Sequence, residues 1–230
     1  MTLRPFFSYY GGKWRASSKY PAPIHATLVE PFAGSAGYAL RYPTKNVVLY
    51  DVDPVVFGVW DYLIHAAEAE IRRLPLYFDH INEVAAPPEA KALIGFWLNH
   101  GTAQPSKSPS AWMRAGKHNS SFWGPKIQSR IIDQQSHIRH WKVYNQSYLD
   151  APNDIATWFI DPPYQTPAGR HYKFDVIDYG NLGHWCRSRK GQAIVCEQDG
   201  ADWLPFESIG HVKSTLGKSS EVVYLGNSLG

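Results

Sequence analysis

The sequence contains little cysteine and has no long apolar run. Its 230 residues include only two cysteines, Cys186 and Cys196, which are too few for a disulfide framework or a four-cysteine zinc site. A membrane-spanning helix needs about 20 consecutive apolar residues, and the first residues lack the continuous apolar core of a secretory signal. We therefore expect a protein of the cytoplasm, without membrane contact.

Histidine spacing argues against a metal site, and the net charge excludes a uniformly basic protein surface. The ten histidines show no metal-ligand spacing, and His137 and His140 fall on a predicted surface helix, so we expect no metal. The net charge is only +3, which excludes a uniformly basic coat. Any nucleic-acid surface has to be a local patch.

Basic charge is concentrated in residues 101–142. This segment has seven basic residues and one acidic residue, whereas the rest of the chain has 16 basic and 19 acidic residues. It also contains the aromatic residues Trp112, Phe122, Trp123 and Trp141. Such a composition suits phosphate contact and base stacking. The alternative is a solvated loop followed by an amphipathic helix, with Ile127, Ile131, Ile138 and Trp141 facing the core.

Short apolar runs predict an α/β fold. Three of them, residues 27–29, 47–50 and 158–160, are followed at once by acidic or turn residues, as in buried strands of a parallel sheet. Residues 35–40 between the first two runs predict a short helix, which makes a βαβ unit. Further helices are expected over residues 54–65, 68–80 and 89–99, and further strands over 193–196 and 222–225.

The tetrapeptide Asp161-Pro162-Pro163-Tyr164 directly follows the third run. We therefore expect it at the carboxyl end of a strand, where open α/β sheets bind ligands. The exocyclic amine of adenine is a poor nucleophile, and two acceptors aimed at its N–H bonds favour its attack on a methyl group. Asp161 and the prolyl carbonyls could supply those acceptors, while Tyr164 offers a flat face to an extruded base. The alternative is a Pro-Pro turn with a capping Asp.

Three other loops carry weaker signals. In residues 30–37, Gly34 would let a ligand approach the backbone, and Glu30 could accept a bond from an ammonium; a simple tight turn is the alternative. Asp51 ends the second run, where an acid commonly binds a ribose, or else caps a helix. Residues 9–13 hold Lys13, which the alternative interpretation places in solvent.

In this order the motifs resemble those of the Dam-like DNA adenine-N6 methyltransferases, a family with the Asp-Pro-Pro-Tyr type of catalytic motif. The matching residues are 8–13, 29–35, 50–53, 146–148 and 161–164. The resemblance covers residues 7–65 and 143–165 well and is loose over 75–142 and the C-terminal third. It implies a Rossmann-like S-adenosylmethionine-dependent methyltransferase sheet with helices on both faces. The catalytic domain would be residues 1–74 and 143–230, and a small basic target-recognition insert would be residues 75–142.

The resemblance also implies roles for individual residues. The methyl group of S-adenosylmethionine would pass to N6 of an adenine flipped out of double-stranded DNA, without a metal. The catalytic residues would be Asp161, Pro162, Pro163 and Tyr164. The cofactor would contact Tyr9, Lys13, Glu30, Pro31, Phe32, Ala33, Gly34, Asp51, Ser147, Tyr148 and Asp161. Within this set, Lys13 would hold the methionine end and Asp51 the ribose.

The insert occupies the position of the family's target-recognition segment. We expect residues 119–126 to form a hairpin tip and the DNA contacts to include Arg114, Lys117, Asn119, Trp123 and Lys126. Ala36, with Gly37 beside it, replaces the third glycine of the nucleotide loop, so altered packing is expected there. RNA as the substrate and a catalytically inactive nucleic-acid-binding homologue stay open as alternatives, as does the biological role.

Overall fold

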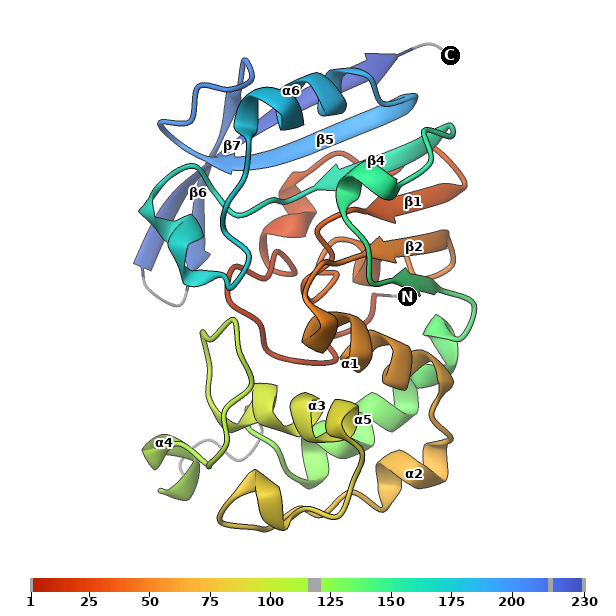
Figure 1. Ribbon diagram of the computed structural model, residues 1–230, viewed down its shortest axis with the longest axis vertical. Coiled ribbons are helices and arrows are strands. Elements are labelled where there is room, and N and C mark those ends of the chain that lie inside the picture. Colours follow the sequence, from red (N-terminus) through yellow and green to blue (C-terminus); the bar gives the residue numbers. More distant parts are fainter. Residues whose placement is uncertain (1, 116–120, 215–216, 229–230) are drawn as a thin grey trace.

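The computed structural model describes residues 2–115, 121–214 and 217–228 (Figure 1). Its strands are β1 (Thr27–Glu30), β2 (Asn46–Tyr50), β3 (Lys142–Tyr144), β4 (Ala156–Ile160), β5 (Gly191–Gln198), β6 (Glu207–Ser214) and β7 (Gly217–Ser228). Its α-helices are α1 (Pro54–His65), α2 (Glu68–Arg72), α3 (Pro88–Leu98), α4 (Ala111–Arg114), α5 (Pro125–Gln135) and α6 (Tyr179–Arg187). In these parts of the chain, no helix combines the length and the apolar character needed to cross a membrane.

The strands form one seven-stranded sheet in the order β3-β2-β1-β4-β5-β7-β6. The first five strands in this order run parallel, and β7 runs antiparallel to both β5 and β6. The order reverses between β1 and β4, so the loops that follow these two strands diverge and leave a crevice at the carboxyl edge. This is a Rossmann-like α/β sheet, and the predicted fold class is confirmed.

Alternating side chains bury both faces of the sheet. On one face, Leu28, Phe159 and Ile194 pack with α1 and the N-terminal segment. On the other face, Trp158 and Val195 pack with α6, which lies along β5 in Figure 1. Because helices cover both faces, nearly every β4 and β5 side chain is buried, which explains the apolar runs over residues 158–160 and 193–196 within these strands.

Helices α2, α3 and α5 gather beside α1, away from the β5–β7 end of the sheet (Figure 1). Their buried side chains Ile71, Leu93 and Ile131 belong to the same apolar cluster as Trp60 of α1. Ile127, Ile131, Ile138 and Trp141 are all buried. The amphipathic-helix interpretation of residues 125–142 is thus confirmed for these four side chains.

Three predicted elements differ from the structure. The helix expected over 35–40 is only a 3-10 turn, Ala39–Arg41, because the chain is left-handed at Ala36 with φ +49°. The helix expected over 68–80 ends at Arg72, shortly before Pro75. The hairpin expected over 119–126 is wrong because Pro125 begins α5; residues 119 and 120 lie outside the described residues.

Gly37 lies in the loop after β1, and it permits close contact between this loop and the loop that carries Lys13. A Cβ atom at this position would lie 2.5 Å from the backbone nitrogen of Trp14 and 2.9 Å from that of Lys13. A Cβ at Gly12 would likewise meet the Ser35 hydroxyl at 2.9 Å. The loop that carries Lys13 can therefore pack on the loop after β1 only where side chains are absent.

Replacing Gly37 with alanine should destabilise the protein by about 1–3 kcal/mol, because backbone cannot yield as a flexible side chain can. Urea denaturation measures the loss. Gly180→Ala is the matched control, since its new Cβ would lie 3.3 Å from the movable Asp178 carboxylate. It should stay within about 1 kcal/mol of the wild type. Equal stability of the Gly37→Ala variant and the wild type would contradict the packing argument.

Candidate active site

A cavity of about 310 Å³ opens at the carboxyl edge of the sheet, beside β1, β2 and β4. Every residue predicted to contact the cofactor lines it: Tyr9, Lys13, Glu30, Pro31, Phe32, Ala33, Gly34, Asp51, Ser147, Tyr148 and Asp161. Residues far apart in sequence meet here because parallel strands end at one edge. The rings of Phe32 and Tyr148 stack in its wall with centroids 5.2 Å apart.

Glu30 and Gly34 serve the loop itself as well as the cavity. The Glu30 carboxylate accepts the backbone N–H of Ala39 at 2.6 Å and is 2% exposed. Burial raises the pKa of Glu30 well above its usual range, although hydrogen bonds from the backbone of Ala39 and Tyr38 oppose the rise. Gly34 has φ +44°, and a Cβ there would lie 3.1 Å from the Tyr9 ring. The absence of a side chain at Gly34 therefore lets the Tyr9 ring pack closely against this loop.

Asp51 ties the ends of β1 and β2 together. Its carboxylate accepts the backbone N–H groups of Gly34 and Asp53, each at 2.9 Å. Burial raises the pKa of Asp51 to about 6, against the lowering effect of these two bonds. The cap of α1 is Asp53, which accepts the N–H of Val55 at 2.9 Å. The helix-cap alternative for Asp51 is thus wrong, and Asp51 is one of the residues that line the cavity.

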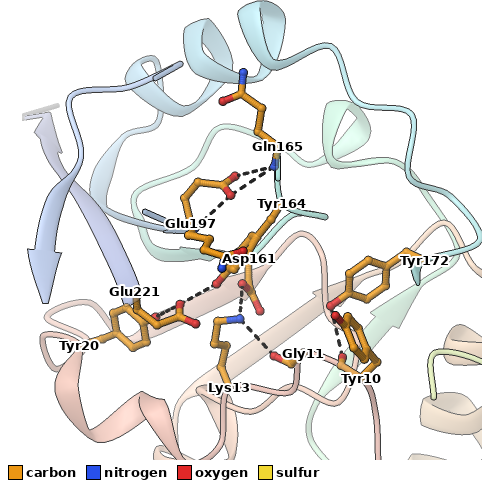
Figure 2. A network of polar contacts seen from close by, with 11 residues as sticks. Tyr10, Gly11, Lys13, Tyr20, Asp161, Tyr164, Gln165, Tyr172, Glu197 and Glu221 are labelled. Atoms are coloured by element: carbon orange, nitrogen blue, oxygen red, sulfur yellow. Dashed lines mark hydrogen bonds and ion pairs between the residues drawn. The ribbon is translucent and has the colours of Figure 1, made fainter. Parts of the chain in front are cut away.

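Lys13 and Asp161 form a buried ion pair in the cavity wall (Figure 2). Lys13 Nζ lies 3.0 Å from Asp161 Oδ1, donates to the Gly11 carbonyl at 3.1 Å and is only 7% exposed. Burial alone would lower the pKa of Lys13, but the Asp161 and Glu221 carboxylates raise it above its usual value. The solvated-lysine alternative is therefore wrong.

Burial also changes the pKa of Asp161, the acid of this pair. It raises that pKa to about 6. The Lys13 charge opposes the rise, and the Glu221 charge adds to it. At pH 7–8 the Asp161 side chain is consequently a carboxylate, able to accept hydrogen bonds but held close to its protonation point.

The other residues of the motif point to different neighbours. Pro163 lines the cavity, and its carbonyl accepts the Tyr179 hydroxyl at 2.9 Å. The Tyr164 hydroxyl donates to Glu221 of β7 at 2.7 Å, and the Lys13 ammonium lies 4.6 Å from the Tyr164 ring centroid. The Lys13 ammonium thus occupies one face of the Tyr164 ring. Unlike Asp161 and Pro163, Pro162 and Tyr164 are not among the described residues that line the cavity.

One wall of the cavity, and the Glu221 carboxylate that binds the Tyr164 hydroxyl, could not be predicted from the sequence. Residues Tyr172, Lys173, Phe174, Val176 and Ile177 close the cavity on one side. The Tyr172 hydroxyl donates to the Tyr10 carbonyl at 3.3 Å (Figure 2). This wall is irregular chain without hydrophobic periodicity, so no pattern in the sequence indicates it.

Much of the basic segment has a structural role. Trp123 is 3% exposed and donates its indole N–H to the Pro75 carbonyl at 2.8 Å, so its prediction as a DNA contact is wrong. Arg130 lies over the Trp97 ring, and Arg139 donates to the carbonyls of Ile64 and Ala66.

Most of the described basic side chains of the segment are exposed, whereas three of its four aromatic side chains, Phe122, Trp123 and Trp141, are buried. Arg114 and Lys126 are exposed, and so is Trp112, at 64%. Lys117 and Asn119 lie outside the described residues. Of the described residues that were predicted to contact DNA, Arg114 and Lys126 are the exposed ones.

Metal-binding and sulfur chemistry find no support in the described ranges. Within residues 2–115, 121–214 and 217–228, no three His, Cys, Asp or Glu side chains gather as a metal ion would require. Cys186 and Cys196 are both free and buried.

Comparisons with known proteins assign neither a family nor an activity to this chain. No protein-family model matches the chain, and no curated protein matches it. Among solved structures, a "putative methylase" from Haemophilus influenzae aligns over 88% of this chain and 87% of its own. The two are 12% identical with a TM-score of 0.34. A likeness at this level assigns no activity.

Replacing Lys13 with methionine should raise the pKa of Asp161 further above about 6, by roughly one pH unit or more, because the opposing charge is lost. Carbon-13 NMR titration of the aspartate carboxyls measures it. Lys173→Met is the matched control, since it removes an exposed lysine of the same cavity. An unchanged Asp161 titration in Lys13→Met would show that the ion pair does not set its charge.

Proposed function

We propose that this protein is an S-adenosylmethionine-dependent methyltransferase that methylates N6 of adenine in DNA. The observation that carries the proposal is the place of Asp161. It follows β4 at the carboxyl edge and faces a cavity whose other walls are the loop after β1 and the acid after β2. The Asp-Pro-Pro-Tyr sequence supports an exocyclic amine as the acceptor.

The chemistry asked of Asp161 is to make the amine a better nucleophile. Its carboxylate accepts one N–H of the amine, and the Pro162 carbonyl accepts the other, which favours a tetrahedral nitrogen. The Pro163 carbonyl is already bonded to Tyr179, so the second acceptor falls to Pro162. Neither proline has an N–H to compete, and their fixed φ angles keep the acceptors in place.

The cavity residues fit the proposed cofactor. When bound, S-adenosylmethionine supplies an activated methyl group. Asp51 presents its carboxylate to the cavity and can accept ribose hydroxyls, as acids at the end of a second strand commonly do. The Phe32 and Tyr148 rings offer apolar surface for an adenine. Lys13 is the cation that could hold a carboxylate at the methionine end.

The acceptor amine must leave its base pair to reach Asp161, because an adenine within a duplex is stacked. The exposed side chains Arg114 and Lys126, with Lys173 at the cavity, are candidates for phosphate contacts. RNA would require the same amine chemistry. Transfer of labelled methyl from S-adenosylmethionine to DNA and RNA oligonucleotides, followed by nucleoside analysis, distinguishes the two. An inactive binding homologue would bind nucleic acid and label neither.

Replacing Asp161 with asparagine should lower kcat for methyl transfer at least about 100-fold, because the charged acceptor is lost where positive charge develops. Cofactor binding, measured by calorimetry, should persist in part. Asp202→Asn is the matched control: Asp202 accepts from the side chain of Gln165 nearby but is exposed. Wild-type turnover in Asp161→Asn would exclude the mechanism.

DNA affinity should fall steeply with added salt, and replacing Arg114 or Lys126 with glutamine should reduce the slope of log K against log salt by about one each. Fluorescence anisotropy with a DNA duplex at several salt concentrations measures the slope. Lys190→Gln is the control, because Lys190 is exposed just before β5, at the opposite edge of the sheet. Equal slopes in all four proteins would place the DNA surface elsewhere.

A further inference from the structure

Glu221 reaches the proposed active site because β7 runs antiparallel. Glu221 pairs with Gln198 at the carboxyl end of β5, so an early residue of β7 lies at the edge where β4 and β5 end. It lies two residues before Val223, whose side chain belongs to the same core as Phe159. The Glu221 side chain therefore projects from the face that carries Asp161, and it is 6% exposed.

The Glu221 carboxylate binds Tyr164 directly (Figure 2). Its Oε2 accepts the Tyr164 hydroxyl at 2.7 Å and the Tyr20 hydroxyl at 3.3 Å. Tyr164 is thus held at both ends, by its backbone in the rigid Pro-Pro segment and by its hydroxyl on β7. A buried carboxylate with two phenol donors is a stronger and more directional anchor than a neutral acceptor.

Glu221 also belongs to the charge group around Asp161. The titratable and charged groups whose electrostatic interaction with Asp161 the structure shows are Lys13, Tyr20, Glu30, Tyr164, Tyr172, Cys196, Glu197 and Glu221. Lys13 is the cation among them, and it interacts with both Asp161 and Glu221. Two carboxylates from different strands therefore share one buried ammonium.

We propose that Glu221 is a positioning residue for methyl transfer: it fixes the Tyr164 ring and shares the Lys13 charge with Asp161. The inference rests on the proposed function, and it adds the C-terminal strand to the site. Glu221 is not one of the described residues that line the cavity. It acts through the orientation of Tyr164 and through the balance of charge at the amine acceptor.

Two substitutions separate these contributions. Glu221→Gln keeps an acceptor oxygen for Tyr164 but removes the negative charge. Because Glu221 helps to raise the pKa of Asp161, this variant should move the acid limb of the kcat–pH profile down by roughly half to one pH unit. Its plateau rate should stay within about threefold of the wild type, since the amide oxygen still accepts the Tyr164 hydroxyl, in a weaker bond than the carboxylate makes but in the same place.

Glu221→Ala removes the charge and the acceptor together. It should shift the acid limb in the same direction and also lower the plateau about tenfold or more, because the Tyr164 hydroxyl loses its partner. Tyr20→Phe is the matched control: it removes the longer bond to the same oxygen and leaves the charges unchanged. Its pH profile should match the wild type. If Glu221→Ala does not fold, Glu221→Gln alone carries the test.

A second readout does not depend on activity. Carbon-13 NMR titration of Asp161, in protein without DNA or cofactor, should show the same downward shift in Glu221→Gln. A wild-type protein that transfers no methyl to DNA or RNA would refute the proposed function, yet a shifted Asp161 titration would still support the charge coupling. An unshifted titration together with an unchanged pH profile would overturn the role of Glu221.

Discussion

The buried ion pair between Lys13 and Asp161 is the contact on which the site depends. Removing either charge from water is costly unless its partner is in place, so the N-terminal loop and the end of β4 have to meet. They can meet only because Gly12 and Gly37 have no side chains, which lets the loop that carries Lys13 pack on the loop after β1. The same requirement fixes Tyr164, whose ring lies against the Lys13 ammonium.

The sheet brings the other acids of the site to the same edge as this ion pair. Parallel strands deliver Glu30, Asp51 and Asp161 to one edge, and the reversal of strand order between β1 and β4 opens the space between their loops. Backbone N–H groups, not cations, hold Glu30 and Asp51. Lys13 is left to neutralise the acids on the β4 side. It opposes the rise in the Asp161 pKa that burial causes, so Asp161 remains a carboxylate and a hydrogen-bond acceptor.

Residues next to strand ends could be predicted from the sequence, and residues whose place depends on strand direction or irregular chain could not. Asp51 and Asp161 follow apolar runs, so their edge of the sheet was predictable. Glu221 also adjoins such a run, but it reaches the site only because β7 is antiparallel, which no local pattern reveals. Trp123 was misassigned because composition does not show whether an aromatic side chain of a basic segment is packed inside it.

The antiparallel course of β7 has a consequence for the order of events during synthesis. Until residues 217–228 leave the ribosome, β5 is the edge of the sheet, and its eight residues offer unpaired backbone to any other strand. Over the same interval Tyr164 has no carboxylate to bind. A nascent chain at this stage is therefore exposed to aggregation, and the strand that protects the edge is also the one that brings Glu221 to the Tyr164 hydroxyl.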